Sequence, residues 1–185
     1  DDFFVVGRGI TAGLSILSVL LIYLIGRQLF GRRAGLLAAA LLAVSVTHIQ
    51  LSHFMTVDLI LSFFIVLTLF LAVRFVRRRT VWRALLMGLA VGAAMACKVS
   101  GATAGALIAG AGILALLIPD AGGRRSNPLR VAGWMIMAGA GVILAFGLFE
   151  FYALLDLETY RAAIGAQAEM VSGADWPFTR QYVNT

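Results

Sequence analysis

The first hundred residues contain four polar or ionisable side chains that could form a functional site: two histidines, one aspartate and one lysine. His48, His53 and Asp58 lie in HIQLSHFMTVD (residues 48–58), a polar interruption between two hydrophobic segments. Lys98, the single lysine of the chain, closes another apolar stretch. A charged side chain that faces lipid near the bilayer centre costs about 2.5–3.5 kcal/mol, so these groups should lie at a membrane interface or face a polar cavity. They are the first candidates for a functional site.

Each candidate has a structural as well as a chemical interpretation. His48, His53 and Asp58 follow one another at intervals of five residues, which on a helix turns successive side chains by about 140° and does not bring them onto one face as an i, i+4 pair does. Interfacial polar residues are therefore favoured over a metal site built from these residues alone. Lys98 can be an interfacial lysine whose stem lies along apolar surface, or a point charge for a phosphate. The sequence leaves both interpretations of Lys98 open.

The composition is that of a polytopic membrane protein. Of the 185 residues, 61% are hydrophobic and 13% are charged, and the mean hydropathy is +0.95. A transmembrane helix needs about 20 apolar residues, so the chain predicts an all-α protein with about six transmembrane helices. The sequence has no P-loop, GxGxxG, CxxC or GxSxG motif, so soluble nucleotide-dependent chemistry and serine hydrolysis have no support.

The six helices are expected at about residues 8–27, 34–48, 57–79, 82–98, 102–118 and 130–154. The second is short for a crossing, and a re-entrant hairpin is the competing interpretation. The fourth and fifth are rich in glycine and alanine (GLAVGAAMA and ATAGALIAGAGI), which predicts close helix packing. Residues 1–155 are interpreted as the transmembrane domain and residues 156–185 as the start of an extracytoplasmic segment.

Arginines orient these helices. Eleven of the fourteen arginines fall in three clusters at alternate ends of the hydrophobic segments: Arg27, Arg32 and Arg33; Arg74, Arg77, Arg78, Arg79 and Arg83; Arg124, Arg125 and Arg130. The positive-inside rule interprets them as cytoplasmic anchors, and binding of anionic lipid headgroups is a lesser alternative. The net charge of +6 then implies no nucleic-acid partner. The chain is predicted to lie in the inner (plasma) membrane with its N-terminus and its C-terminal tail extracytoplasmic.

This topology gathers the candidate residues on the outer side. Eight of the nine acidic residues fall there or at its edge, Asp120 being the exception, and acidic residues contribute little to topology. Their placement is therefore free to reflect chemistry. Cys97 is the single cysteine, which excludes an intrachain disulfide. Because the sequence opens with Asp1 rather than Met, we expect a fragment of a longer chain.

Three segments resemble a known family. They are GRQLFGRRAGLLAAALLAVSVTHIQLSHFMTVDLILSFF, GLAVGAAMACKVSGA and YALLDLETYRAAIGAQAEMVSGADWPFTRQY. Together they are similar to bacterial phospholipid-carrier-dependent glycosyltransferases of the GT-C fold, related to protein O-mannosyltransferases (family 39) and aminoarabinose transferases. Val46 and Leu157 stand where that pattern has prolines.

The resemblance implies transfer of a sugar from a polyprenyl-phosphate donor to an acceptor on the outer face of the membrane. It implies a catalytic part for Asp58 and substrate-binding parts for Lys98, His53 and Arg180, with membrane lipids as partners and a divalent metal ion as an open question. The main catalytic carboxylate of the family lies in a first outer loop, which this sequence lacks. The 185 residues alone are therefore expected to be inactive.

Two other functions fit the composition. A non-catalytic transmembrane subunit of a larger membrane assembly, such as an energy-transducing complex, would pack its small-residue helices against partner subunits and pair its outer acidic residues with protein groups. A transporter is less favoured, because its polar groups would lie near the membrane midplane on broken helices, whereas here they lie at segment ends.

Overall fold

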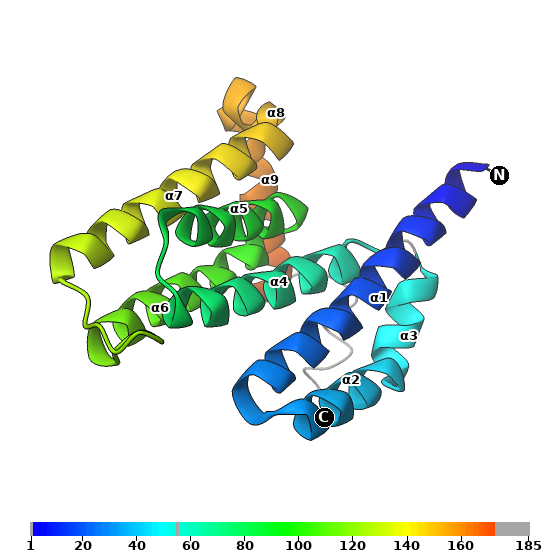
Figure 1. The fold of residues 1–185 in the computed structure, drawn as a ribbon. Coiled ribbons are helices and arrows are strands. Elements are labelled where there is room, and N and C mark those ends of the chain that lie inside the picture. The colour runs from blue at the N-terminus through cyan, green and yellow to red at the C-terminus, as the bar shows by residue number, and fades with distance from the viewer. Residues whose placement is uncertain (1, 55, 173–185) are drawn as a thin grey trace. The chain divides into compact units, whose positions relative to one another are not determined.

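The computed structural model describes residues 2–54 and 56–172, and helices are the regular secondary structure of this part of the chain (Figure 1). The predicted all-α class is confirmed. The elements are α1 (Asp2–Phe30), α2 (Arg32–Ala43), α3 (Val46–His53), α4 (Val57–Arg77), α5 (Val81–Cys97), the 3₁₀ helix η1 (Val99–Ala104), α6 (Gly105–Leu117), α7 (Pro128–Phe149), α8 (Phe151–Leu155) and α9 (Leu157–Ser172). The described residues divide into two compact units, one ending at Phe146 and one beginning at Gly147.

The helices are those of a membrane protein. Within the described residues, four stretches are long and apolar enough to cross a bilayer: Phe4–Phe30, Val57–Arg77, Val99–Leu117 and Pro128–Phe149. The pair α2 and α3 can supply a fifth crossing, whereas α5 is apolar but only 17 residues long. All six predicted segments contain helix, but the second and the fourth are not plain full-length spans. The sixth, predicted to reach residue 154, ends as α7 at Phe149.

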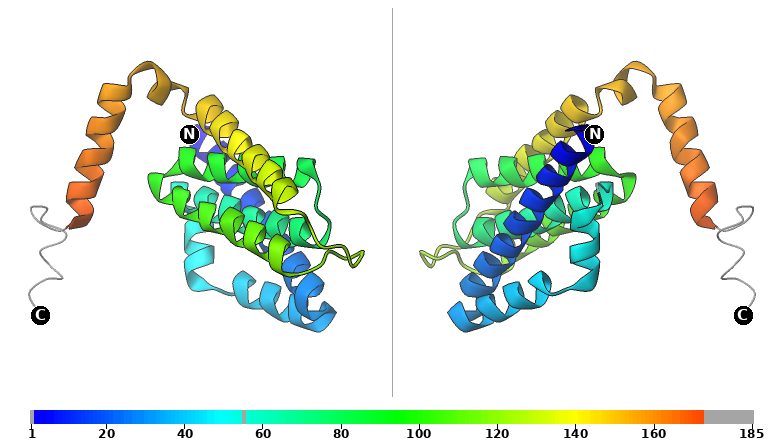
Figure 2. Two further views of the ribbon diagram at one scale, coloured as in Figure 1. Left: turned by 90° about the vertical axis from the view of Figure 1, so that its left-hand side faces the viewer. Right: turned by 90° about the vertical axis from the view of Figure 1, so that its right-hand side faces the viewer.

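The second segment departs from the single helix predicted over residues 34–48, and its bend fits either a broken span or the re-entrant hairpin that was the competing interpretation. Helix α2 ends at Ala43, Ser45 takes an extended conformation with ψ near 119°, and α3 continues at an angle of 57°. Polar contacts hold α3 beside α1, because the Thr11 hydroxyl lies 3.1 Å from the backbone oxygen of Ser52. Figure 2 shows α2 turning back from the end of α1 and α3 bending upward from α2. The polar stretch after His48 is thus a helix of its own rather than a loop.

Helices α1, α4, α5 and α6 bring their ends together in two groups. At one end, the Arg77 guanidinium donates a hydrogen bond to the backbone oxygen of Gln28, and the Ala121 N–H donates to the Arg77 oxygen over 2.9 Å. We call this the arginine-rich end; it holds the ends of α1, α4 and α6 and lies on the left in Figure 1. The Asp58 end lies opposite, where α4 begins and α5 ends.

Small residues let α5 and α7 approach closely, as the glycine and alanine content predicted. A Cβ atom added to Gly88 would lie 1.9 Å from the backbone oxygen of Ala138, so any larger residue at Gly88 would separate the two helices. The adjoining core contains the fully buried Phe75 and Met87, and the Phe75 ring meets the edge of Trp134 at 5.6 Å between centroids. Backbone contact and aromatic packing together fix this part of the bundle.

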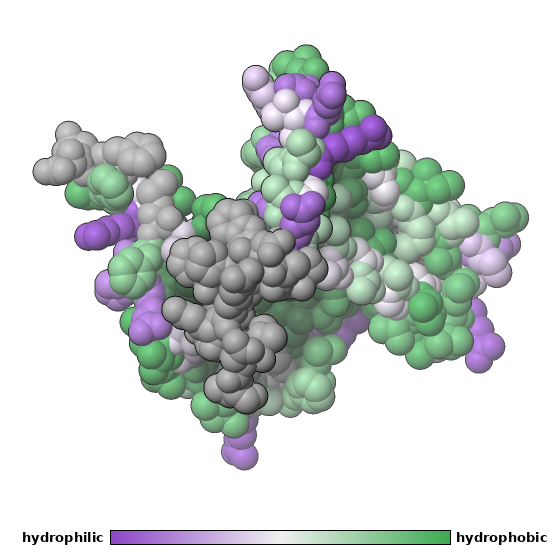
Figure 3. All heavy atoms as spheres, turned by 180° about the vertical axis from the view of Figure 1, so that it is seen from behind, coloured by the Kyte–Doolittle hydropathy of each residue, from purple (hydrophilic) through white to green (hydrophobic). Residues whose placement is uncertain are grey.

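The outer surface is apolar over wide areas (Figure 3). Large aliphatic side chains are exposed on several helices, among them Ile16, Leu37, Leu114, Ile136 and Ile143. Water would penalise such a surface, whereas the hydrocarbon of a bilayer accepts it. The structure therefore agrees with a chain whose solvent is lipid along most of its length.

Candidate functional site

Asp58 and Lys98, forty residues apart in sequence, meet at the Asp58 end. The Lys98 ammonium donates a hydrogen bond to the Asp58 carboxylate, with 3.0 Å between Nζ and Oδ1. Asp58 comes from the first turn of α4, and Lys98 is the residue that ends α5. The two residues that the sequence singled out most strongly therefore belong to one site.

Each charge sits at a helix end that suits it. The N-terminus of a helix carries a partial positive charge and its C-terminus a partial negative charge, so an aspartate is favoured at the start of α4 and a lysine at the end of α5. Thr56 precedes α4 and Lys98 follows α5, both in extended backbone conformations. The antiparallel packing of α4 and α5 then brings the two complementary ends together.

The ion pair remains open to solvent or to a ligand. About half of each side chain is exposed, 49% for Asp58 and 47% for Lys98. An exposed ion pair of this kind stabilises a fold by only about 0–1 kcal/mol, so holding the bundle together is a small part of what it can do. A lysine ammonium carries three N–H donors, and the contact with Asp58 uses one. Lys98 can therefore bind an anion without leaving Asp58.

Gly101 fixes the position of Lys98, a role that the sequence analysis missed. The Gly101 N–H donates to the Lys98 backbone oxygen over 2.7 Å at the start of η1. A Cβ atom at Gly101 would lie 2.3 Å from the backbone oxygen of Ala94 in α5, so a side chain there would displace the turn that carries Lys98. The sequence feature that could have indicated this role is the glycine three residues after the single lysine.

The histidines contact the scaffold rather than the ion pair. His48 Nε2 lies 2.8 Å from the Ser15 hydroxyl of α1, and His53 Nδ1 lies 2.9 Å from the Ile49 backbone oxygen of its own helix. Among the described residues, no group of three or more histidine, cysteine, aspartate or glutamate side chains is placed to hold a metal ion. A substrate-binding part for the exposed His53 stays a prediction, and Arg180 lies outside the described residues.

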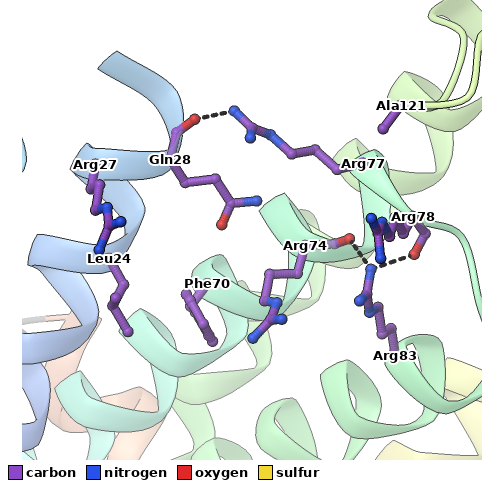
Figure 4. Close-up of a pocket in the computed structure, with 9 residues that line it drawn as sticks. All are labelled: Leu24, Arg27, Gln28, Phe70, Arg74, Arg77, Arg78, Arg83 and Ala121. Atoms are coloured by element: carbon purple, nitrogen blue, oxygen red, sulfur yellow. Dashed lines mark hydrogen bonds between the residues drawn. The ribbon is translucent and has the colours of Figure 1, made fainter. Parts of the chain in front are cut away.

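The arginine-rich end holds a second feature that the sequence did not reveal, a pocket of about 600 Å³. Figure 4 shows its arginines coming from three helices. It is lined by Leu24, Arg27, Gln28, Phe70, Arg74, Arg77, Arg78, Arg83 and Ala121. The sequence grouped all five of these arginines as anchors but could not show that they surround one cavity.

Comparison with known proteins identifies one family. The model of the family described as dolichyl-phosphate-mannose-protein mannosyltransferase matches residues 4–149, more than three quarters of the chain. No curated protein and no solved structure matches the sequence. The matched region contains both Asp58 and Lys98.

Proposed function

Since the chain belongs to the dolichyl-phosphate-mannose-protein mannosyltransferase family, we propose that it serves transfer of a sugar from a polyprenyl-phosphate donor to an acceptor at the extracytoplasmic face of the plasma membrane. Membership confirms the resemblance seen in the sequence and indicates a membrane glycosyltransferase of the GT-C type. The donor, the acceptor and the face of the membrane are the proposed parts.

The observation that carries the proposal is the half-exposed Lys98 ammonium beside Asp58. In the transfer, the acceptor hydroxyl forms a bond to the sugar C1 and releases its proton to water, while the bond between C1 and the phosphate oxygen breaks. The phosphate keeps the electron pair of that bond and its charge changes from −1 to −2. A fixed cation next to the phosphate stabilises the charge that develops, which is the electrostatic contribution that lowers such barriers most.

Asp58 is proposed to act in the same site through its negative charge. Its Oδ1 atom holds the Lys98 ammonium at 3.0 Å, so the cation is oriented before the donor arrives. A preoriented charge needs no rearrangement during the reaction, and this is why it is worth more than a mobile one. The remaining carboxylate surface, also half exposed, faces the space where the donor or acceptor would be positioned.

The separation of the two ends supports the proposed orientation in the membrane. Arginines gather at the arginine-rich end, and positive residues beside membrane helices stay in the cytoplasm. The Asp58 end then faces outward, where a donor with its sugar on the outer side of the membrane would present its phosphate at the depth of the headgroups.

The test is donor binding by Lys98 variants in the membrane-embedded protein. We expect Lys98→Met to weaken binding of a polyprenyl-phosphate sugar about tenfold to a hundredfold, because one charge-assisted hydrogen bond to phosphate is lost. Lys98→Arg should retain most of the affinity. Arg8→Met is the control: it removes an exposed cation of α1 that does not belong to the ion pair, and it should leave donor affinity unchanged.

Equal donor affinity in wild type and Lys98→Met would contradict the proposal. Lys98 would then be an interfacial lysine, and copurification of partner subunits lost specifically in the variant would point to an accessory subunit of a larger assembly instead.

A further inference from the structure

We infer that the pocket at the arginine-rich end binds the phosphate of an anionic phospholipid, whose acyl chain lies in an adjoining apolar groove. This site is separate from the Asp58–Lys98 pair and does not depend on the proposed transfer reaction. Its ligand class is a phosphate ester attached to a hydrocarbon chain.

The first observation is unbalanced charge. Five arginines line the pocket, Arg27 from α1, Arg74, Arg77 and Arg78 from the end of α4, and Arg83 from the first turn of α5, and the described lining includes no acidic side chain. Guanidinium groups bind phosphate through paired N–H donors, and basic pockets between transmembrane helices suit lipid headgroups. The pocket therefore has the charge and the donor groups that a phosphate requires.

The second observation is that two of the five arginines build the pocket and three remain available. Arg77 donates to the Gln28 backbone oxygen, and Arg83 Nη1 lies 2.8 Å from the backbone oxygens of Arg74 and Arg78 (Figure 4). The side chains of Arg27, Arg74 and Arg78 make no hydrogen bond to another described residue. Arg74 rests over the Phe70 ring at 5.4 Å, which orients its guanidinium without using its donors.

The nearest acidic residue in sequence is committed elsewhere. Asp120 adjoins Ala121 of the pocket, but its Oδ1 atom accepts the backbone N–H groups of Gly122 and Arg124, each over 2.9 Å. These bonds keep the carboxylate within its own turn. The positive charge of the pocket is thus left for an anion from outside the protein.

The third observation distinguishes a lipid from a free phosphate. An apolar groove of about 380 Å³ runs along α4 and α6, and Arg77 lines both this groove and the pocket. Leu29, which also lines the groove, follows Gln28 of the pocket in sequence. The remaining groove lining is Leu69, Ala72, Val73, Val76, Ala106, Leu107, Gly110, Ala111, Leu114 and Ile118. A phosphate beside a hydrocarbon groove matches the two halves of a phospholipid.

The charge part is tested by native mass spectrometry of the protein titrated with phosphatidylglycerol or with phosphatidylcholine of the same chains. Wild type should prefer phosphatidylglycerol. Arg74→Gln/Arg78→Gln should lower the affinity for phosphatidylglycerol roughly tenfold to thirtyfold, since each arginine near anionic lipid adds a similar increment to the binding free energy. Arg32→Gln/Arg33→Gln removes the same charge outside the pocket lining and should change the affinity less than threefold. Equal losses in both double variants would overturn a specific site.

The groove part uses Gly110→Leu, whose side chain has open space around the added Cβ and would fill the groove rather than disturb the backbone. It should weaken phosphatidylglycerol binding severalfold while binding of sn-glycerol 3-phosphate, the headgroup without chains, stays unchanged. Gly139→Leu on α7 also has open space and should alter neither. Thermal unfolding without lipid checks that each variant folds. If the soluble phosphate ester binds as tightly as the lipid, and Gly110→Leu has no effect, the ligand is a free phosphate ester and the lipid assignment is wrong.

Discussion

The two ends of the bundle carry charge in opposite ways. At the Asp58 end, the charge of Lys98 is neutralised by Asp58, with 3.0 Å between Nζ and Oδ1. Asp58 lies in the first turn of α4, and Lys98 follows the last turn of α5. At the arginine-rich end, five arginines line one pocket whose described lining has no acidic residue. The Lys98 ammonium is held in place by a carboxylate of the protein itself. The pocket arginines have no such partner among the described residues, so their charge has to be compensated by lipid headgroups or by a bound anion. The first arrangement suits a reaction and the second suits anchoring and an anionic ligand.

The largest expected difference between the two ends is the side of the membrane that each one faces. We expect an all-or-none difference between two single-cysteine variants in a Cys97→Ala background. Gln50→Cys, on α3 near the Asp58 end, should react with an impermeant maleimide added outside intact cells, and Ser126→Cys, in the loop after α6, should react only after the membrane is opened. Reaction of Ser126→Cys from outside would reverse the assignment of the two ends.

A second prediction concerns the negative charge of Asp58. Asp58→Asn keeps the volume of the side chain and removes the charge that orients Lys98, so the rate of sugar transfer measured in the full-length protein should fall about 10²–10³-fold. Because the exposed ion pair contributes little to folding, the thermal unfolding temperature should stay close to that of wild type. A rate within a few fold of wild type would exclude a catalytic part for Asp58.

A third prediction separates the position of Lys98 from its charge. Gly101→Ala forces a Cβ atom against the backbone of α5 and should displace Lys98. In the full-length protein this should lower the transfer rate by up to about 10²-fold, since displacements near 1 Å cost that much. Gly105→Ala, four residues later, has open space and is the matched control. Equal rates in the two variants would show that the turn tolerates a side chain and does not position Lys98.

The smallest expected effect is at the arginine-rich end. The backbone N–H of Arg124, with that of Gly122 and the nearby arginine charges, lowers the pKa of Asp120 below its ordinary value, although slight burial opposes this. A lowered pKa in the folded state means that the ionised carboxylate stabilises the fold above the ordinary value of about 4, and that this contribution is lost as pH falls through the lowered pKa.

Asp120→Asn should therefore show a slightly smaller drop in unfolding temperature than wild type between about pH 4 and about pH 2. At neutral pH the variant should be marginally less stable. Parallel curves for the two proteins over the acidic range would show that the turn does not stabilise the ionised form.

Much of the fold was determined by sequence alone. In lipid the backbone N–H and C=O groups must pair within the protein, and a continuous run of about 20 apolar residues does this as a helix, so the class and the approximate positions of the six segments followed from the hydrophobic runs. The break at Ser45 did not, because the segment contains neither proline nor glycine there, and its direction depends on contacts between α3 and α1 such as that of Thr11 with Ser52.

The candidate site divides in the same way. Single residues stood out by type, since a charged side chain is costly when it faces lipid near the bilayer centre, so an aspartate and a lone lysine beside apolar segments must lie at an interface or face a polar cavity. Their contact was decided by tertiary structure, because the antiparallel packing of α4 on α5 brings together residues forty positions apart. The pocket of five arginines arises likewise where the ends of three helices meet, and a linear pattern of cationic anchors cannot show which of them share a cavity.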